Sequence, residues 1–277
     1  MTWSSLIVYV DDEADNTQRI EQAAALARAH GAHLIGVSAC APETPVADAY
    51  GAGILLGEVL MEQHERAENA LKGAEARFRE IATRAGVSCE WRADVGDPTS
   101  LLIKHARAAD VLIVGRDAAN ASGWRAPHPA DLAMRAGRSI LIVPPNPARS
   151  VVGAPVLLAW TDSRESRLAA VTAVPMLREA ETVRVLELCD PEDMDGARLR
   201  TADVVAWLTR HGVRAEAEAR AHDDRSAGRR LLDCVAEMKA GAIVSGAWGH
   251  ARMRQWIFGG VTQTLITESP VALLLAH

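Results

Sequence analysis

The stretch that decides the fold of this chain is AIVSGAWGHARMRQWIFGGVT, residues 242–262. It opens with a short apolar run typical of a buried strand, and glycines follow at 246, 249, 259 and 260. Glycines between a strand and a helix let several backbone N–H groups converge on one point, and the helix N-terminus adds a partial positive charge. The pattern therefore predicts an anion-binding loop, unless the glycines serve only a turn and a helix start.

On both sides of this strand, short Val/Ile/Leu-rich runs alternate with helical segments, which indicates a parallel sheet covered on both faces. Strands are predicted at 6–10, 33–39, 87–95, 111–115 and 139–145, and again at 156–160, 183–189, 213–219, 242–246 and 271–277. Helices are predicted at 14–30, 58–84, 98–108, 164–179, 199–211 and 226–240. The expected fold class is α/β, with two tandem five-stranded, mostly parallel sheets and helices on both faces.

The two sets of strands repeat at comparable offsets. Leu6 and Val156 are 150 residues apart, whereas Gly86 and Gly212 are 126 apart. The smaller offset means that the first copy holds extra residues between its second and third strands, in an apolar insertion at about 41–60. This insertion is expected to line a pocket, to form a partner surface or to shield the sheet edge.

A Pro-rich segment joins the two copies. It reads PPNPARSVVGAP, residues 144–155, and has the composition of a linker. Each copy is long enough to bury its own sheet, so the repeat indicates a duplicated domain rather than a solenoid. We therefore expect one domain at 1–147 and a second at 154–277.

The composition is that of an ordinary globular protein, with 49% hydrophobic residues, 24% charged residues and a net charge of -6. No basic patch is apparent, so neither nucleic acid nor a membrane surface is expected as a partner. The four cysteines lack the spacing of metal or redox motifs, and no metal site is expected. No apolar run has the length of a membrane span, and the start of the chain lacks the basic region of a signal peptide, so we expect a cytoplasmic protein.

Common enzyme motifs are absent from the sequence. No G-x-G-x-x-G follows the first strand of either copy, and no G-x-x-x-x-G-K-(S/T) occurs, which argues against a dehydrogenase and a P-loop NTPase. Ser163 lacks the G-x-S-x-G context of a hydrolase nucleophile; Asp162 and Ser163 instead fit a helix N-cap. The acidic cluster at 11–15 likewise fits a helix start better than a cation site. No catalytic residue is expected.

The spacing G-x2-G-x9-G at 246–259 resembles the phosphate loop of nucleotide-binding members of the universal stress protein (UspA) family. VLLAWTDSRES (156–166) resembles the first strand and turn of that family, and LITESPVALLLAH (265–277) resembles its closing segment, where a proline precedes the last strand. The first copy matches at LIVYVDD (6–12), HGAHLIGVSA (30–39), ARAADVLIVG (106–115) and RAGRSILIVPP (135–145). The chain thus resembles a tandem, two-domain member.

The resemblance implies an adenine nucleotide alpha hydrolase-like fold, in which the last strands of the two copies pair with each other. It also implies ATP or AMP as the ligand of the second copy, with Mg²⁺ accompanying the nucleotide. The nucleotide-binding residues that it implies are Thr161, Asp162, Ser163, Gly246, Gly249, His250, Arg252, Gly259, Gly260, Val261 and Thr262.

The second copy departs from the family pattern at two positions. Thr161 stands where the family has an Asp at the end of strand one, and Asp162 follows one place later. Gly260 stands where a Ser or Thr is expected after the third glycine, and Thr262 offers a hydroxyl two residues on.

The first copy departs much further from the pattern. Asp11 matches the family's Asp, but Glu13 replaces the expected Ser, and Arg116 and Asp117 follow the strand with no second glycine. The region of the third glycine reads Pro-His-Pro at 127–129, and proline has no N–H to offer a phosphate. We therefore predict that the first copy binds no ATP.

The main hypothesis is a stress-response regulatory protein with an adenine nucleotide in its second domain. The alternative is a UspA-type interaction module that binds no nucleotide, with a protein partner that the sequence does not identify. Weak ATP hydrolysis ranks last because no residue supplies a general base. Apolar last strands at sheet edges would need covering, so association of two chains is also expected.

Overall fold

The computed structural model describes residues 2–11, 16–40, 53–116, 126–247 and 260–277. The strands are β1 (Ser5–Tyr9), β2 (His33–Cys40), β3 (Cys89–Val95), β4 (Val111–Gly115), β5 (Ser139–Val143), β6 (Val156–Trp160), β7 (Val183–Cys189), β8 (Ala215–Ala221), β9 (Ala242–Gly246) and β10 (Ala272–Ala276). The helices are α1 (Asn16–His30), α2 (Gly53–Ala85), α3 (Pro98–His105), α4 (Pro129–Arg135), α5 (Arg164–Glu179), α6 (Met194–Arg210), α7 (Ala227–Glu237) and α8 (Gly260–Glu268), with short 3-10 turns at Ala106–Ala108 and Pro191–Asp193. Every predicted strand is present.

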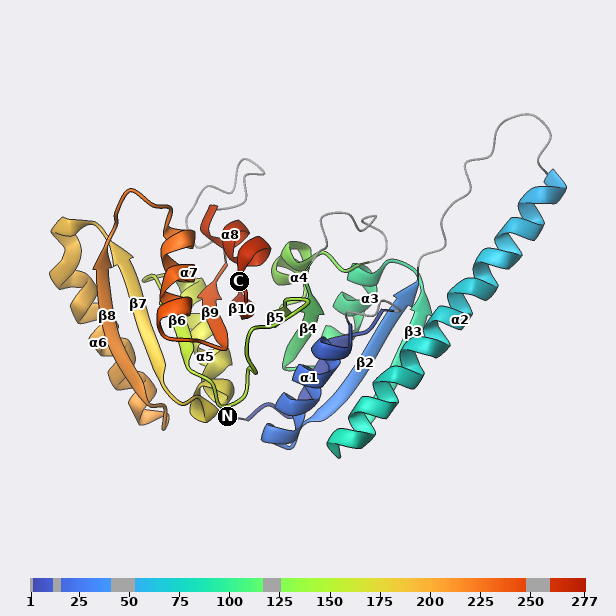
Figure 1. Cartoon of the computed structure of the whole chain (residues 1–277), viewed down its shortest axis with the longest axis horizontal. Coiled ribbons are helices and arrows are strands. Elements are labelled where there is room, and N and C mark those ends of the chain that lie inside the picture. The colour runs from blue at the N-terminus through green and yellow to red at the C-terminus, as the bar shows by residue number, and fades with distance from the viewer. Residues whose placement is uncertain (1, 12–15, 41–52, 117–125, 248–259) are drawn as a thin grey trace.

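All ten strands join one continuous sheet in the order β3-β2-β1-β4-β5-β10-β9-β6-β7-β8 (Figure 1). Neighbouring strands are parallel except at the centre, where β5 and β10 run antiparallel with Leu141 opposite Leu274. Each half therefore contributes five strands in the same order, and the predicted pairing of the last strands across the two copies is confirmed. The predicted α/β fold class is confirmed as well.

Helices cover both faces of the sheet, as the near-continuous apolar strands predict. One face packs against α1, α2, α5 and α6, and the other face packs against α3, α4, α7 and α8. Representative buried contacts on the two faces are Ile20, Phe78, Ala173 and Leu208 on the first, and Leu102, Leu132, Leu231 and Leu265 on the second. The inner strands between these layers are mostly buried, whereas the edge strands β3 and β8 are partly exposed.

The way two helices end explains why the predicted starts of the following strands, at 87 and 213, were wrong. Gly212 has a φ of 78°, and the N–H of Val213 donates to the carbonyl of Leu208 at 3.1 Å. This is the Schellman arrangement, in which a left-handed glycine closes the helix and the next residue folds back on it. Gly86 ends α2 in the same way. Residues 87 and 213, predicted as strand starts, therefore belong to helix ends, and β3 and β8 begin two residues later.

The apolar last strands lie at the centre of the sheet, because β5 and β10 cover each other. The outer edges are β3 and β8, which carry charged residues such as Glu90 and Arg92 on β3 and Glu218 and Arg220 on β8. Charged edge strands resist further strand pairing. The apolar last strands thus give no reason for two chains to associate, and that association stays a prediction.

Helix α2 is the element that distinguishes the two halves most. It has 33 residues, whereas its counterpart α6 has 17. Residues 53–60 of the predicted insertion form the first turns of this helix, and 41–52 lie outside the described residues. None of the helices in the described ranges, α2 included, is long and apolar enough to cross a membrane.

Candidate functional site

The second half has its topological switch point between β6 and β9. These strands are parallel neighbours, but β6 leads through α5 to β7 on one side, and β9 leads to α8 and β10 on the other. Open α/β sheets bind ligands in the crevice that such diverging connections leave at the carboxyl ends of the strands. The predicted residues at 161–163 and Gly246 follow or end these two strands, so the structure brings them to the same edge.

A group of hydroxyl side chains lies at this edge, where α5 begins. Ser163 is the N-cap of α5, and its Oγ accepts a hydrogen bond from the backbone N–H of Ser166 at 3.2 Å. The hydroxyls of Thr161 and Ser166 are 3.0 Å apart. The N-cap that the sequence predicts at this point is therefore provided by Ser163, and the first turn of α5 is fixed by three short polar side chains.

Asp162 lies on the outer side of the same turn. Its carboxylate forms an ion pair with Arg167 at 2.5 Å, and both side chains are more than half exposed. The neighbouring position 161 holds a threonine, so Asp162 is the acidic residue nearest the end of β6. Its partner Arg167 belongs to the helix α5 that follows. A ligand that used Asp162 would have to compete with Arg167.

Gly246 has a steric rather than a conformational reason to be glycine. Its φ lies outside the left-handed region that favours glycine. A Cβ at this position would lie 2.5 Å from the backbone nitrogen of Ser166 and 2.7 Å from the carbonyl carbon of Glu165. The missing side chain allows the first turn of α5 to rest directly on the tip of β9.

Helix α8 supplies the other helix N-terminus near β9. Gly260 and Val261 are exposed at its start, whereas Thr262 is only 7% exposed. Burial of Thr262 disfavours it as the hydroxyl that replaces the family's Ser or Thr. Four predicted site residues, Gly249, His250, Arg252 and Gly259, lie outside the described residues.

Two residues of this edge escaped the sequence reasoning. Ser166 is buried and bonded to Thr161, and the spacing Ser163-x-x-Ser166 after a strand is the signal that points to it. Trp160 ends β6, and its indole N–H is buried without a hydrogen-bond acceptor among the described residues. No sequence signal distinguishes this tryptophan from an ordinary core residue.

The corresponding switch point of the first half, between β1 and β4, is filled by an ion pair. Asp11 and Arg19 are joined at 2.8 Å, with side chains 20% and 10% exposed. The guanidinium of Arg19 lies against Gly115 at the tip of β4 and over the ring of Tyr9, 5.8 Å from its centroid. The position that Ser166 occupies beside Gly246 is thus taken here by a long, charged side chain.

The remaining first-half residues also serve structure. Arg116, next after β4, donates a hydrogen bond to the carbonyl of Ser269 in the second half, and burial lowers the pKa of Arg116. His128 caps α4 by accepting from the N–H of Asp131 at 3.4 Å. Glu13 and Asp117 lie outside the described residues.

The acidic side chains of the described ranges form no group that could hold a metal ion. No three His, Cys, Asp or Glu residues converge there, and Asp11 of the N-terminal acidic cluster pairs with Arg19. Mg²⁺ remains an expectation that is tied to a bound nucleotide.

Known proteins of the same architecture are found by sequence and by structure. The model of the universal stress protein family matches residues 3–143, about half of the chain. The structure is similar to a universal stress protein from Archaeoglobus fulgidus DSM 4304, with a TM-score of 0.73 and 14% identity over 98% of this chain and 97% of that chain. It is also similar to a functionally unknown protein from Pseudomonas aeruginosa PAO1, with a TM-score of 0.58 and 13% identity over 99% of this chain and 92% of that chain. No curated protein sequence matches this chain.

The repeated switch point and the shared central strands define a tandem, doubly wound α/β protein. The chain belongs to the universal stress protein family. The family match falls in the first half, although the glycine spacing that carries the sequence resemblance is in the second. The likeness to the Archaeoglobus protein extends over both halves, in keeping with a tandem two-domain architecture.

Proposed function

We propose that this universal stress protein is a stress-response regulator that binds an adenine nucleotide, ATP or AMP, in its second half. The observation that carries the proposal is the difference between the two switch points. The tips of β6 and β9 meet short hydroxyl side chains and the start of α5, whereas a buried ion pair fills the same place in the first half. A ligand needs an accessible crevice at this edge, so the second half is the candidate.

The phosphates are assigned to the backbone N–H groups of the glycine loop and the N-terminus of α8, because both favour negative charge. His250 and Arg252 add positive charge to the loop when they face the phosphates, and Mg²⁺ would neutralise the remaining charge. The first turn of α5 is assigned to the ribose or the base. The residues in these roles are Gly246, Gly249, Gly259, Gly260, Val261 and Thr262 for the phosphates, and Thr161, Asp162 and Ser163 for the nucleoside.

The alternative function is an interaction module that binds no nucleotide. Three observations favour it. Thr161 stands where the family has an Asp, Asp162 is paired with Arg167, and Thr262 is buried. A universal stress protein solved in complex with cAMP shares 26% identity over 52% of this chain, but its TM-score of 0.39 is too low to transfer that ligand. ATP, AMP and cAMP therefore belong together in the same binding test.

The test is equilibrium titration of the full chain with a fluorescent ATP analogue, with AMP and cAMP as competitors. Gly249→Asp places a carboxylate in the glycine loop and is expected to abolish binding, because it repels phosphate. The matched control is Ala118→Asp, the position 131 residues earlier, which is expected to leave binding unchanged. Unchanged affinity in Gly249→Asp, or no binding by the wild-type chain, would favour the interaction module.

The rest of the proposal concerns the whole chain. We take 1–147 and 154–277 as its two domains and the cytoplasm as its compartment, and we assign it binding without appreciable hydrolysis. A homodimer and a further protein partner complete the proposed arrangement. The regulatory role would then rest on nucleotide-dependent contacts of the second half.

A further inference from the structure

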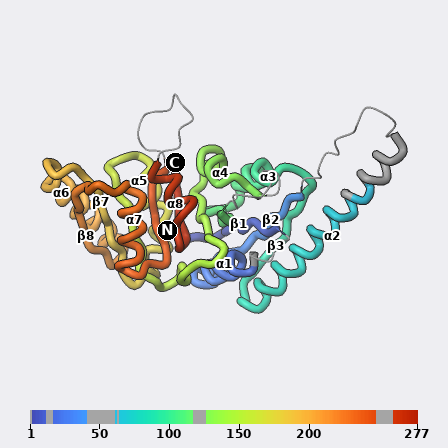
Figure 2. Tube along the Cα trace, turned by 45° about the horizontal axis from the view of Figure 1, so that its top comes forward, coloured from blue at the N-terminus to red at the C-terminus, as the bar shows by residue number. Residues whose placement is uncertain are grey.

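The stretch of α2 at 61–66 extends past the sheet without packing on it (Figures 1 and 2). The side chains of Met61, Glu62, Glu65 and Arg66 are exposed, and Met61 is 69% exposed. Among the side chains of α2 that the structure describes, Ala67 is the first that is buried. Most helices in proteins are stabilised by packing an apolar face, so this part of α2 lacks its usual support.

The apolar sequence pattern of α2 nevertheless continues towards its N-terminus. Ala67, Ala74, Phe78 and Ile81 are buried at helical spacing, and the same stripe extended backwards reaches positions 60 and 56, which are both leucine. The segment 53–61 reads GILLGEVLM and contains six large apolar residues. An apolar stripe that continues beyond the body of a soluble protein marks a contact surface.

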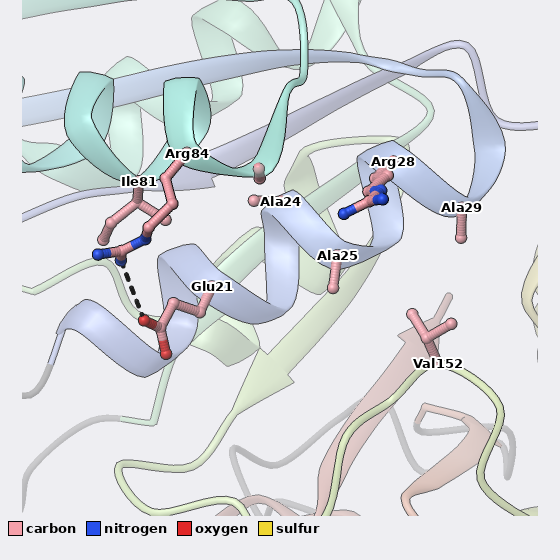
Figure 3. Close-up of a pocket in the computed structure, with 9 residues that line it drawn as sticks. Glu21, Ala24, Ala25, Arg28, Ala29, Ile81, Arg84 and Val152 are labelled. Atoms are coloured by element: carbon pink, nitrogen blue, oxygen red, sulfur yellow. Dashed lines mark hydrogen bonds and ion pairs between the residues drawn. The ribbon is translucent and has the colours of Figure 1, made fainter.

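A groove lies at the other end of α2, between α1 and α2 (Figure 3). Its volume is about 500 Å³, and its floor is made of small apolar side chains from both helices. Arg28 and Arg84 stand at its rim, and Arg84 is joined to Glu21 at 3.3 Å. The lining residues are Glu21, Ala24, Ala25, Arg28, Ala29, Ile81, Arg84, Ala85 and Val152.

The two ends of α2 carry opposite charge. Residues 53–69 contain four glutamates and one arginine, for a net charge of -3, and residues 70–85 contain four basic and two acidic residues, for a net charge of +2. Two copies of α2 laid antiparallel about their midpoint put the acidic end of each beside the basic end of the other. In that register position 57 of one copy lies opposite position 81 of its partner, at the groove.

We infer that two copies of this chain associate through antiparallel α2 helices, with the acidic, apolar segment 53–66 of each copy seated at the α1–α2 groove of the other. A two-fold symmetric pair closes on itself, so both segments and both grooves are covered at once. Recognition follows the helix-in-groove mode, with apolar anchors in the groove and charges along its rim. This inference locates the homodimer of the proposed function and is independent of its nucleotide.

The first test is the mass of the full chain in solution, by light scattering coupled to size exclusion. The wild type is expected to have twice the chain mass of 29.7 kDa, and Leu56→Glu is expected to have the mass of one chain. Leu199→Glu, on the equivalent helix α6, changes a leucine that is 71% exposed and is expected to stay dimeric. A monomeric wild type overturns the dimer altogether, whereas a dimeric Leu56→Glu overturns only its location.

A charge-reversal series tests the antiparallel register even where Leu56→Glu does not fold. Glu62→Lys with Glu65→Lys puts like charges opposite the basic end and is expected to produce monomers. Adding Lys72→Glu and Arg77→Glu reverses both ends and is expected to restore the dimer. Failure of the fourfold variant to dimerise while it folds normally would refute antiparallel pairing.

Discussion

The two switch points of this protein differ in what rests against the glycine at the tip of the inner strand. In the first half the guanidinium of Arg19 lies against Gly115 and pairs with Asp11. In the second half the backbone of α5 lies against Gly246, and the nearby side chains are short hydroxyls. The comparison teaches that a duplicated sheet keeps its topology while the side chains at its strand tips differ in length and charge.

The largest effect is expected from Arg19→Met. The substitution removes the ion pair between Arg19 and the mostly buried carboxylate of Asp11, and breaking such a pair costs about 3 kcal/mol of unfolding free energy. The matched change is Arg167→Met, which breaks the exposed pair with Asp162 and is expected to cost at most about 0.5 kcal/mol. Urea denaturation of both variants measures the difference. Equal losses of unfolding free energy would show that the pair of Arg19 and Asp11 stabilises the protein no more than the exposed pair does.

The next effect separates the two strand-tip glycines. Gly246→Ala forces a methyl group into the backbone of α5, and overpacking of this kind costs about 2 kcal/mol. Gly115→Ala meets only the end of the Arg19 side chain, which can move, so its cost is expected to be smaller. Thermal unfolding ranks the two variants, and a larger loss for Gly115→Ala would contradict the proposed packing.

A smaller effect is expected at the cap of α5. Ser163→Ala removes the bond to the N–H of Ser166, and loss of such an N-cap costs about 1 kcal/mol. Ser163→Asp keeps an acceptor at the cap and is expected to retain most of the stability. Equal decreases in the denaturant midpoints of the two variants would show that the N-cap hydrogen bond does not stabilise this turn.

The smallest effect is a pH dependence of stability at the end of α1, which the equivalent position of the second half should not show. His30 ends α1, burial lowers its pKa from 6.5, and Glu179 partly opposes the shift. Below about pH 6.5 the imidazole of His30 is therefore protonated more readily in the unfolded chain than in the folded chain. The unfolding free energy consequently falls as the pH drops through that range. Ala180, 150 residues later, cannot titrate. His30→Gln is expected to flatten the curve between pH 7.5 and about pH 5.5, and an unchanged slope would assign the effect to other groups.

The sequence predicted the parts of this fold that depend on local pattern. Apolar runs such as 111–115 and 242–246 coincide with β4 and β9, because strands buried on both faces leave a continuous hydrophobic signal. Gly212 correctly marked the end of a helix. The start of the following strand was predicted two residues too early, because the residue after a Schellman glycine belongs to the helix end.

The candidate site was less accessible to sequence reasoning, because its character depends on contacts between distant residues. The glycine spacing drew attention to Gly246, but the steric reason for a glycine there became clear only from the contact of α5 with this residue. Arg19 lies among helical residues with no motif around it, and its contact with Gly115 joins positions 96 residues apart. Trp160 likewise looks like any core aromatic until its N–H proves to lack an acceptor among the described residues.

The most direct test of the central claim is the stoichiometry of nucleotide binding by the full chain, measured by isothermal titration calorimetry with ATP and Mg²⁺. Because an ion pair lies at the first switch point and hydroxyl side chains lie at the second, the expected result is one nucleotide per chain. Two nucleotides per chain would show that the ion pair of Asp11 and Arg19 does not close the first half. No binding of ATP, AMP or cAMP would remove the nucleotide site from the second half as well.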